Sequence, residues 1–224
     1  MKTIFGIRSA MPINKKLKNG HMMYDWVVRQ KGFPVFCLRS LCGENQLSSE
    51  EMDFLKGKDC KIGFVLDDLT ERAVSRLNGV EDALRAVEAA QNLGVPQDAG
   101  IAIFAEIQPD WSVNHNWMIS FAQVIAGNGY VPGFIGNTDS SKNFNFDRQC
   151  SHFVEATVDV DGFKAVYAAT EPKLDNVPES WEPYCPSVLE PEDMSFWVCG
   201  ETTFGDVVVG DVYAQNESVL AKLW

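Results

Sequence analysis

Residues 80–107, VEDALRAVEAAQNLGVPQDAGIAIFAEI, contain the pattern of a helix, a turn and a strand in direct succession. Apolar residues recur at helical spacing over 83–90, which predicts a helix with one apolar face. Gly94 and Pro96 end this helix, because glycine closes helices readily and proline cannot continue one. Residues 101–107 follow as a strand-like segment in which an apolar run over 101–105 leads into Glu106, and such a run is typical of a strand covered on both faces.

The same alternation extends along the whole chain. Seven further segments have the strand-like character of 101–107, namely 3–7, 33–40, 61–67, 130–136, 163–170, 194–200 and 207–214. Helices are expected between them, for example over 48–57 with a Ser48-x-x-Glu51 capping box, over 112–129 and over 146–157. Residues 171–193 hold five prolines without any period and are expected to form a loop.

Eight strands separated by helices, at roughly 28 residues per unit, predict an α/β fold of the single (β/α)8 TIM-type barrel class. Some helices are expected to be short or missing. A doubly wound open sheet is the competing architecture, but its glycine-rich first turn is replaced by RSAMPIN after the first strand. No linker or repeat divides the chain, so residues 1–224 are expected to form one domain.

Composition excludes several classes of partner. The chain has 224 residues, 46% of them hydrophobic, and 19 basic against 31 acidic residues give a net charge of −12. Such a surface repels nucleic acid and anionic membranes. No apolar run approaches the roughly 18 residues of a membrane span, and the N-terminal segment lacks a signal-peptide core. The cellular location and the oligomeric state stay open.

Neither metal nor cofactor is expected. The six cysteines are scattered without a C-x-x-C pair, and the three histidines lack zinc-ligand spacing. The cysteines are expected to be free thiols, which favours a reducing compartment. No G-x-S-x-G sequence indicates a serine hydrolase.

Polar residues stand at several predicted strand ends, where barrel enzymes gather their functional groups. They are expected to meet in one acidic cleft rimmed by Trp111 and Trp197, and include Arg8, Arg39, Asp67, Asp68, Glu106, Gln108, Asn137, Asp139, Glu171, Glu201 and Asp211. Aromatic faces beside carboxylates suit sugar rings. The alternatives are purely structural roles, namely salt bridges for the charged residues and core packing for the two tryptophans.

Four segments in this order resemble the glycoside-hydrolase-like family of domains of unknown function, which is related to family 25 lysozymes. They are GFPVFCLRSL, LSSEEMDFLKGKDCKIGFVL, GVEDALRAVEAAQNLGVPQDAGIAIFAE and NGYVPGFIGNT, and the similarity covers roughly 4–215. The resemblance implies a (β/α)8 barrel that acts on or binds cell-wall polysaccharide of the peptidoglycan type.

The resemblance also assigns residues. Glu106 matches the acid that closes the fourth strand, Asp211 matches the acid of the eighth, and Arg39 matches the arginine of the second. Two acidic positions differ, because Arg8 replaces the acid of the first strand and Gln108 replaces the second acid after strand four. Taken together with the strand-end placement, the candidate catalytic groups are Glu106 with Asp211 or Asp67, and the candidate glycan-binding residues are Arg8, Arg39, Gln108, Trp111, Asn137 and Trp197.

Glycoside cleavage needs two carboxyl groups in different protonation states. An arginine beside Glu106 favours an ionised carboxylate over a proton donor. Three functions therefore stay open: a glycosidase, a barrel without catalysis that binds glycans or assembles with other proteins, and a different hydrolase on the same scaffold. The spacing of carboxyl groups around Glu106 discriminates between the first two.

Overall fold

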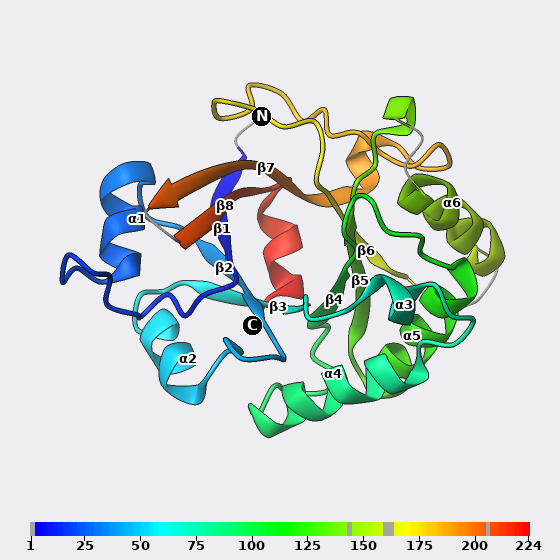
Figure 1. The fold of residues 1–224 in the computed structure, drawn as a ribbon, viewed down its shortest axis with the longest axis horizontal. Helices are drawn as coiled ribbons and strands as arrows, with labels where there is room; N and C mark the ends of the chain where they lie inside the picture. Colours follow the sequence, from blue (N-terminus) through cyan, green and yellow to red (C-terminus); the bar gives the residue numbers. More distant parts are fainter. Residues whose placement is uncertain (1–2, 143–144, 159–163, 205–206) are drawn as a thin grey trace.

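The computed structural model describes residues 3–142, 145–158, 164–204 and 207–224. Eight strands form one closed barrel in sequence order, with helices around its outside (Figure 1). The predicted barrel is confirmed. Residue 163, the first of the strand expected over 163–170, lies outside the described residues.

The strands are short except for the last two. They are β1 Ile4–Ser9, β2 Phe36–Ser40, β3 Lys61–Leu66, β4 Ala102–Glu106, β5 Val131–Gly136, β6 Val166–Ala169, β7 Met194–Phe204 and β8 Val207–Ala214. The α-helices are α1 Met23–Lys31, α2 Ser49–Lys56, α3 Glu71–Val74, α4 Val80–Asn92, α5 His115–Gly127 and α6 Asn145–Thr157. Among the described residues no α-helix follows β6 or β7, as expected for a barrel with missing helices. Helix α1 was not expected from the sequence.

Strand β8 departs from the expected barrel, in which all eight strands are parallel. It pairs antiparallel with both β7 and β1, whereas the pairs from β1 through β7 are parallel. The reason is the connection, because β7 and β8 are joined as a hairpin and hairpin strands must run in opposite directions. The carboxyl end of β8 therefore lies at the opposite end of the barrel from those of the other strands.

Side chains alternate between the inside and the outside of the barrel along each strand. The inner cluster takes alternate residues, such as Phe36 and Leu38 of β2 and Phe104 of β4. Cys37, which lies between Phe36 and Leu38, and Ile103, which precedes Phe104, belong to the larger cluster under the helices. This parity decides which strand-end residues can reach the inner cleft.

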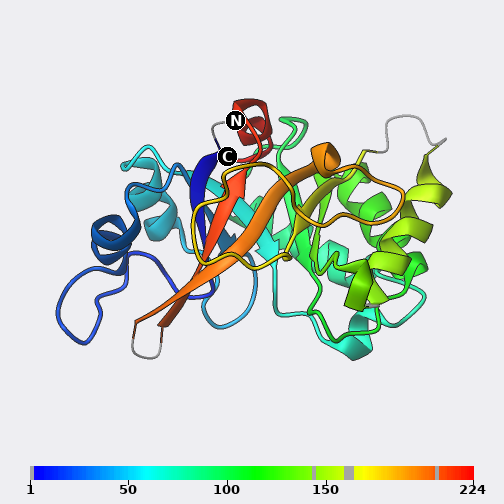
Figure 2. The same ribbon diagram turned by 90° about the horizontal axis from the view of Figure 1, so that it is seen from above.

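The C-terminal 3-10 helix η3, Glu217–Lys222, closes the barrel at the end where β8 finishes. Val219 and Leu223 belong to the inner cluster. Trp224 exchanges backbone hydrogen bonds with Ile62, at 2.7 and 2.9 Å, as a further strand residue would. Figure 2 shows this red helix at one end of the barrel and the β7–β8 hairpin projecting from the other.

Helix α2 begins at the predicted position, but only one of the two hydrogen bonds of the predicted capping box forms. The Ser48 hydroxyl accepts a hydrogen bond from the Glu51 backbone nitrogen at 3.1 Å. The Glu51 side chain does not return the bond to Ser48 within the described residues. It is turned into the protein, where it binds Arg39 and the Ile13 backbone nitrogen. The capping box is therefore incomplete because a buried arginine takes its second member.

Candidate functional site: the cleft around Glu106

A cavity of about 510 Å³ opens at the carboxyl ends of strands β1 to β7. Its wall contains four acidic and two basic residues, which are Asp67, Glu106, Glu171, Glu201, Arg8 and Lys173. Gln108, Thr170, Val198 and Val208 contribute to the same wall. Arg8, Asp67, Glu106 and Gln108 thus meet in one cleft, as the strand-end rule predicted.

Arg8 lies between two carboxylates and contacts both. Its Nη2 atom is 2.5 Å from Asp67 Oδ2 and 2.7 Å from Glu106 Oε2. Its Nε donates a further hydrogen bond to Glu106 Oε2 at 3.2 Å. Burial alone would lower the pKa of Arg8, but the charges of Glu106 and Asp67 outweigh this effect and raise it. The guanidinium therefore stays charged.

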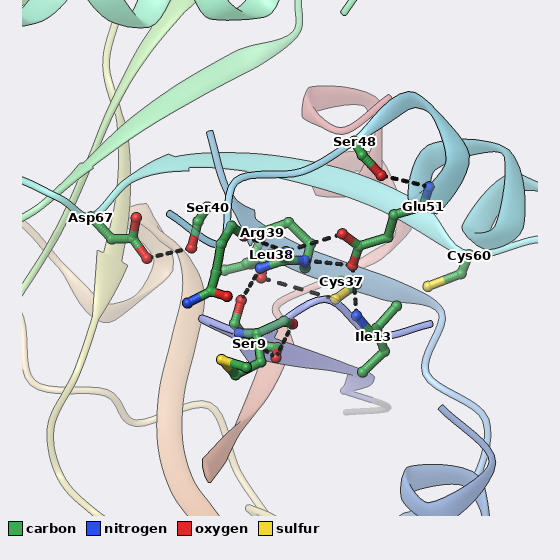
Figure 3. Close-up of polar contacts among 12 residues, drawn as sticks. Ser9, Ile13, Cys37, Leu38, Arg39, Ser40, Ser48, Glu51, Cys60 and Asp67 are labelled. Carbon is green, nitrogen blue, oxygen red and sulfur yellow. Dashed lines mark hydrogen bonds and ion pairs between the residues drawn. The ribbon is translucent and has the colours of Figure 1, made fainter. Parts of the chain in front are cut away.

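The position of Arg8 sets the spacing of the two carboxylates. Because Asp67 Oδ2 and Glu106 Oε2 touch the same nitrogen, they are at most about 5 Å apart, close to the separation in retaining glycosidases. The space between them holds a guanidinium, however, so a sugar cannot enter there. Ser40 also donates to Asp67 Oδ2, at 2.5 Å, and this contact is visible in Figure 3.

The small size of Gly210 lets Arg8 occupy this place. Gly210 lies opposite Arg8 in the β1–β8 pair, and a Cβ atom built on it would be 3.3 Å from Arg8 Cβ. A larger residue would press on the arginine from the β8 side. Neither the serine nor the glycine was recognised as part of the site from the sequence. Ser40 ends the predicted second strand, which is the signal that points to it.

Two polar atoms beside the cavity are enclosed without a hydrogen-bond partner among the described residues. They are Arg8 Nη1 and Thr170 Oγ1. Both side chains contribute to the cavity wall. Enclosed polar groups without partners are uncommon in native proteins, and they mark this wall as a place with unmet hydrogen-bonding capacity.

Arg39 does not lie in the cleft, contrary to expectation. It stands between the inward-facing Leu38 and Ser40, so its side chain points outward beneath α2. There it is fully buried and pairs with Glu51 at 2.6 and 3.0 Å, and it also donates to the Ser9 carbonyl at 2.5 Å (Figure 3). Arg39 fastens a helix to the barrel wall and has no surface to offer a ligand.

The expected placement of Asp211 beside Glu106 is also wrong. Asp211 pairs with the ammonium group of Lys31, at the end of α1, at 2.7 Å. It contributes to a different cavity of about 290 Å³, together with Phe5 and Tyr213. Gly210 and Val212, its neighbours, line the cleft and the barrel interior, so Asp211 faces the outside of β8.

Neither tryptophan forms the expected sugar platform. Trp197 is 2% exposed, packs edge-on against Trp181 outside the barrel and donates its indole hydrogen to the Pro172 carbonyl. Trp111 is half-buried against the core under the helices and does not contribute to the cavity wall. Packing therefore accounts for both side chains.

Asn137 and Asp68 lie near the cleft without lining it. Asn137 is buried, and its amide nitrogen donates to Glu171 Oε1 at 3.4 Å. Asp68 pairs with Arg85 of α4 on the far side of the strand end. Glu171 lines the same cavity as Asp67 and Glu106, as expected from the sequence. The Asn137 amide supports its carboxylate from behind.

The cysteines form no disulfide bond, as the structure shows them. All six cysteines are free, and burial raises the pKa of Cys60 and Cys199 to about 12. Among the described residues no cluster of three or more His, Cys, Asp and Glu side chains is arranged to hold a metal ion. In the same residues no helix has the length and apolar character needed to cross a membrane.

The fold has several solved relatives. An uncharacterized protein of B. stearothermophilus superposes with a TM-score of 0.80 at 21% identity, covering 99% of this chain and 100% of that one. The Tat-secreted protein Rv2525c of Mycobacterium tuberculosis, in complex with L-tartrate, gives 0.62 at 14% identity, covering 97% and 98%.

A family GH25 lysozyme from Aspergillus fumigatus gives a TM-score of 0.55 at 12% identity, covering 99% of this chain and 98% of the lysozyme. No protein-family model matches the chain, and no curated protein matches it either. At these identities the comparisons establish the barrel fold, which resembles that of GH25 lysozymes, and leave the chemistry of the cleft to its own residues.

Proposed function

We propose that this protein is a glycan-binding barrel that holds cell-wall polysaccharide of the peptidoglycan type in the cleft around Glu106 without cleaving it by the lysozyme route. The observation that carries this proposal is the position of Arg8. Its guanidinium fills the gap between the carboxylates of Asp67 and Glu106. A glycosidase needs that gap for the scissile bond.

The cleft has the chemistry of a sugar-binding site. Carboxylate oxygens accept hydrogen bonds from sugar hydroxyls, and the amide of Gln108 can both donate and accept. Arg8 and Thr170, which also line the cavity, each carry a polar atom without a hydrogen-bond partner among the described residues. Likeness of the fold to lysozymes supports a cell-wall glycan as the ligand.

Hydrolysis by a different pair of acids is the second candidate. Glu106 Oε1 makes no hydrogen bond within the described residues, whereas its Oε2 carries all contacts with Arg8. Glu171 lines the same cavity. A mechanism through Glu106 and Glu171 would therefore not need the space that Arg8 occupies.

Sedimentation with insoluble peptidoglycan distinguishes the two functions. We expect the wild type to sediment with purified peptidoglycan and to release no reducing ends. Glu106→Gln removes the charge at constant size and should weaken binding by about tenfold, which corresponds to one lost charge-assisted hydrogen bond. Glu50→Gln, an exposed position on α2, is the matched control and should bind as the wild type does.

Two results would contradict the proposal. Reducing ends released by the wild type and lost in both Glu106→Gln and Glu171→Gln would establish hydrolysis by the second pair. Failure of the wild type to sediment with peptidoglycan would remove the glycan as ligand.

A further inference from the structure

The β7–β8 hairpin extends well past the rim of the barrel. The pairing of β6 with β7 ends at Ala169 and Trp197, and that of β1 with β8 ends at Ser9 and Val209. Strand β7 continues to Phe204, which at about 3.3 Å per residue carries it roughly 23 Å beyond its last pairing with β6, whereas β8 extends about 7 Å beyond its last pairing with β1. Figure 2 shows this projection on the side of the barrel away from η3.

One face of the hairpin is anchored and the other is open. Val207 and Val209 are 6% and 2% exposed and belong to the core cluster outside the barrel. Val208, between them, points to the opposite face and is 47% exposed. One face of this part of β8 therefore packs against the core, and the other face is open to solvent.

The open face borders the cleft. Val198 and Glu201 of β7 and Val208 of β8 line the same cavity as Glu106. The hairpin thus continues one wall of the cleft outward from the rim, with an apolar side chain and a carboxylate on it. Apolar contact for the face of a ring and an acceptor for its hydroxyls are what a sugar unit requires.

We propose that the open face of the hairpin binds the sugar units that follow the one held at Glu106, so that the ligand is an oligomer and affinity rises with its length. This inference rests on the proposed function and adds the size of the ligand to it. Recognition of a longer ligand is favoured because a β-branched valine side chain has little rotamer freedom to lose when further units bind.

Calorimetric titration with the disaccharide and the hexasaccharide of N-acetylglucosamine tests the inference. We expect the wild type to bind the hexasaccharide about tenfold more tightly than the disaccharide, beyond the statistical gain from additional registers. Val208→Asp places a charge on the open face and should reduce this ratio to about threefold or less. Val177→Asp makes the same change at an exposed valine outside the cleft and should keep the wild-type ratio.

Equal affinities for the two oligomers, or an unchanged ratio in Val208→Asp, would show that the hairpin binds no sugar units. The cleft would then bind only a short glycan. If neither oligomer binds, the inference fails as well. The peptidoglycan sedimentation assay then shows separately whether the proposed function falls with it.

Discussion

Replacing Arg8 by methionine tests whether one guanidinium holds the cleft together. The change keeps most of the side-chain volume and removes the cation from between Asp67 and Glu106. Two carboxylates about 5 Å apart repel by about 3 kcal/mol at an effective dielectric constant of about 20. Removal of one partner from a buried ion pair costs about 3–5 kcal/mol. The three side chains are 10–21% exposed, so we expect the lower end, about 3 kcal/mol.

Urea unfolding at neutral pH measures this loss, and thermal unfolding should show a decrease in Tm of about 6–12 °C. The double variant Arg8→Met/Glu106→Gln should recover at least about 1 kcal/mol, because it removes one of the two repelling charges. Arg72→Met, at an exposed position of α3, is the matched control and should change stability by less than about 0.5 kcal/mol. A loss below about 1 kcal/mol for Arg8→Met, or a double variant no more stable than the single one, would refute the reasoning.

Three further predictions concern the rest of the barrel. Glu51→Ala strands a buried arginine and should cost about 3–5 kcal/mol in urea unfolding, whereas Glu50→Ala should stay within about 0.5 kcal/mol; similar losses would contradict the buried pair. Burial raises the pKa of Cys60 to about 12, so a thiol reagent at pH 8 should label the half-exposed Cys185 first and Cys60 only after unfolding. Because its folded pKa is raised, this thiol stabilises the fold fully below about pH 9 and loses that contribution as pH rises towards 12. Trp197→Phe should lower the free energy of unfolding by about 1 kcal/mol through its lost hydrogen bond but leave glycan affinity within about twofold; a larger loss of affinity would return Trp197 to the cleft.

The barrel was predictable because its signals are local. The run over 101–105 is apolar on both faces, and the turn at Gly94 and Pro96 ends a helix of clear period. Those features are typical of one strand–helix unit repeated around a barrel. Glu106 and Gln108 reached the cleft for the same reason, since the carboxyl end of a parallel strand faces the functional side.

The errors arose at continuous apolar strands, whose sequence does not show which side chains face the inside of the barrel. Arg39 and Trp197 stand one position away from inward-facing residues, and an unbroken run such as FPVFCLRS gives no sign of which residues face in. Asp211 was misplaced for the same reason. Its neighbour Gly210 lines the cleft, whereas the Asp211 side chain lies on the outer face of β8.

The reversed last strand also sets the order in which the molecule can be completed. While the ribosome is still translating, β1 and β7 each carry an unpaired edge, and neither finds a partner until residues 207–224 have emerged. The same segment supplies Val219 and Leu223, which plug the barrel floor. A chain that lacks residues 207–224 would therefore keep two open sheet edges and an unplugged barrel, and exposed edges of this kind invite aggregation.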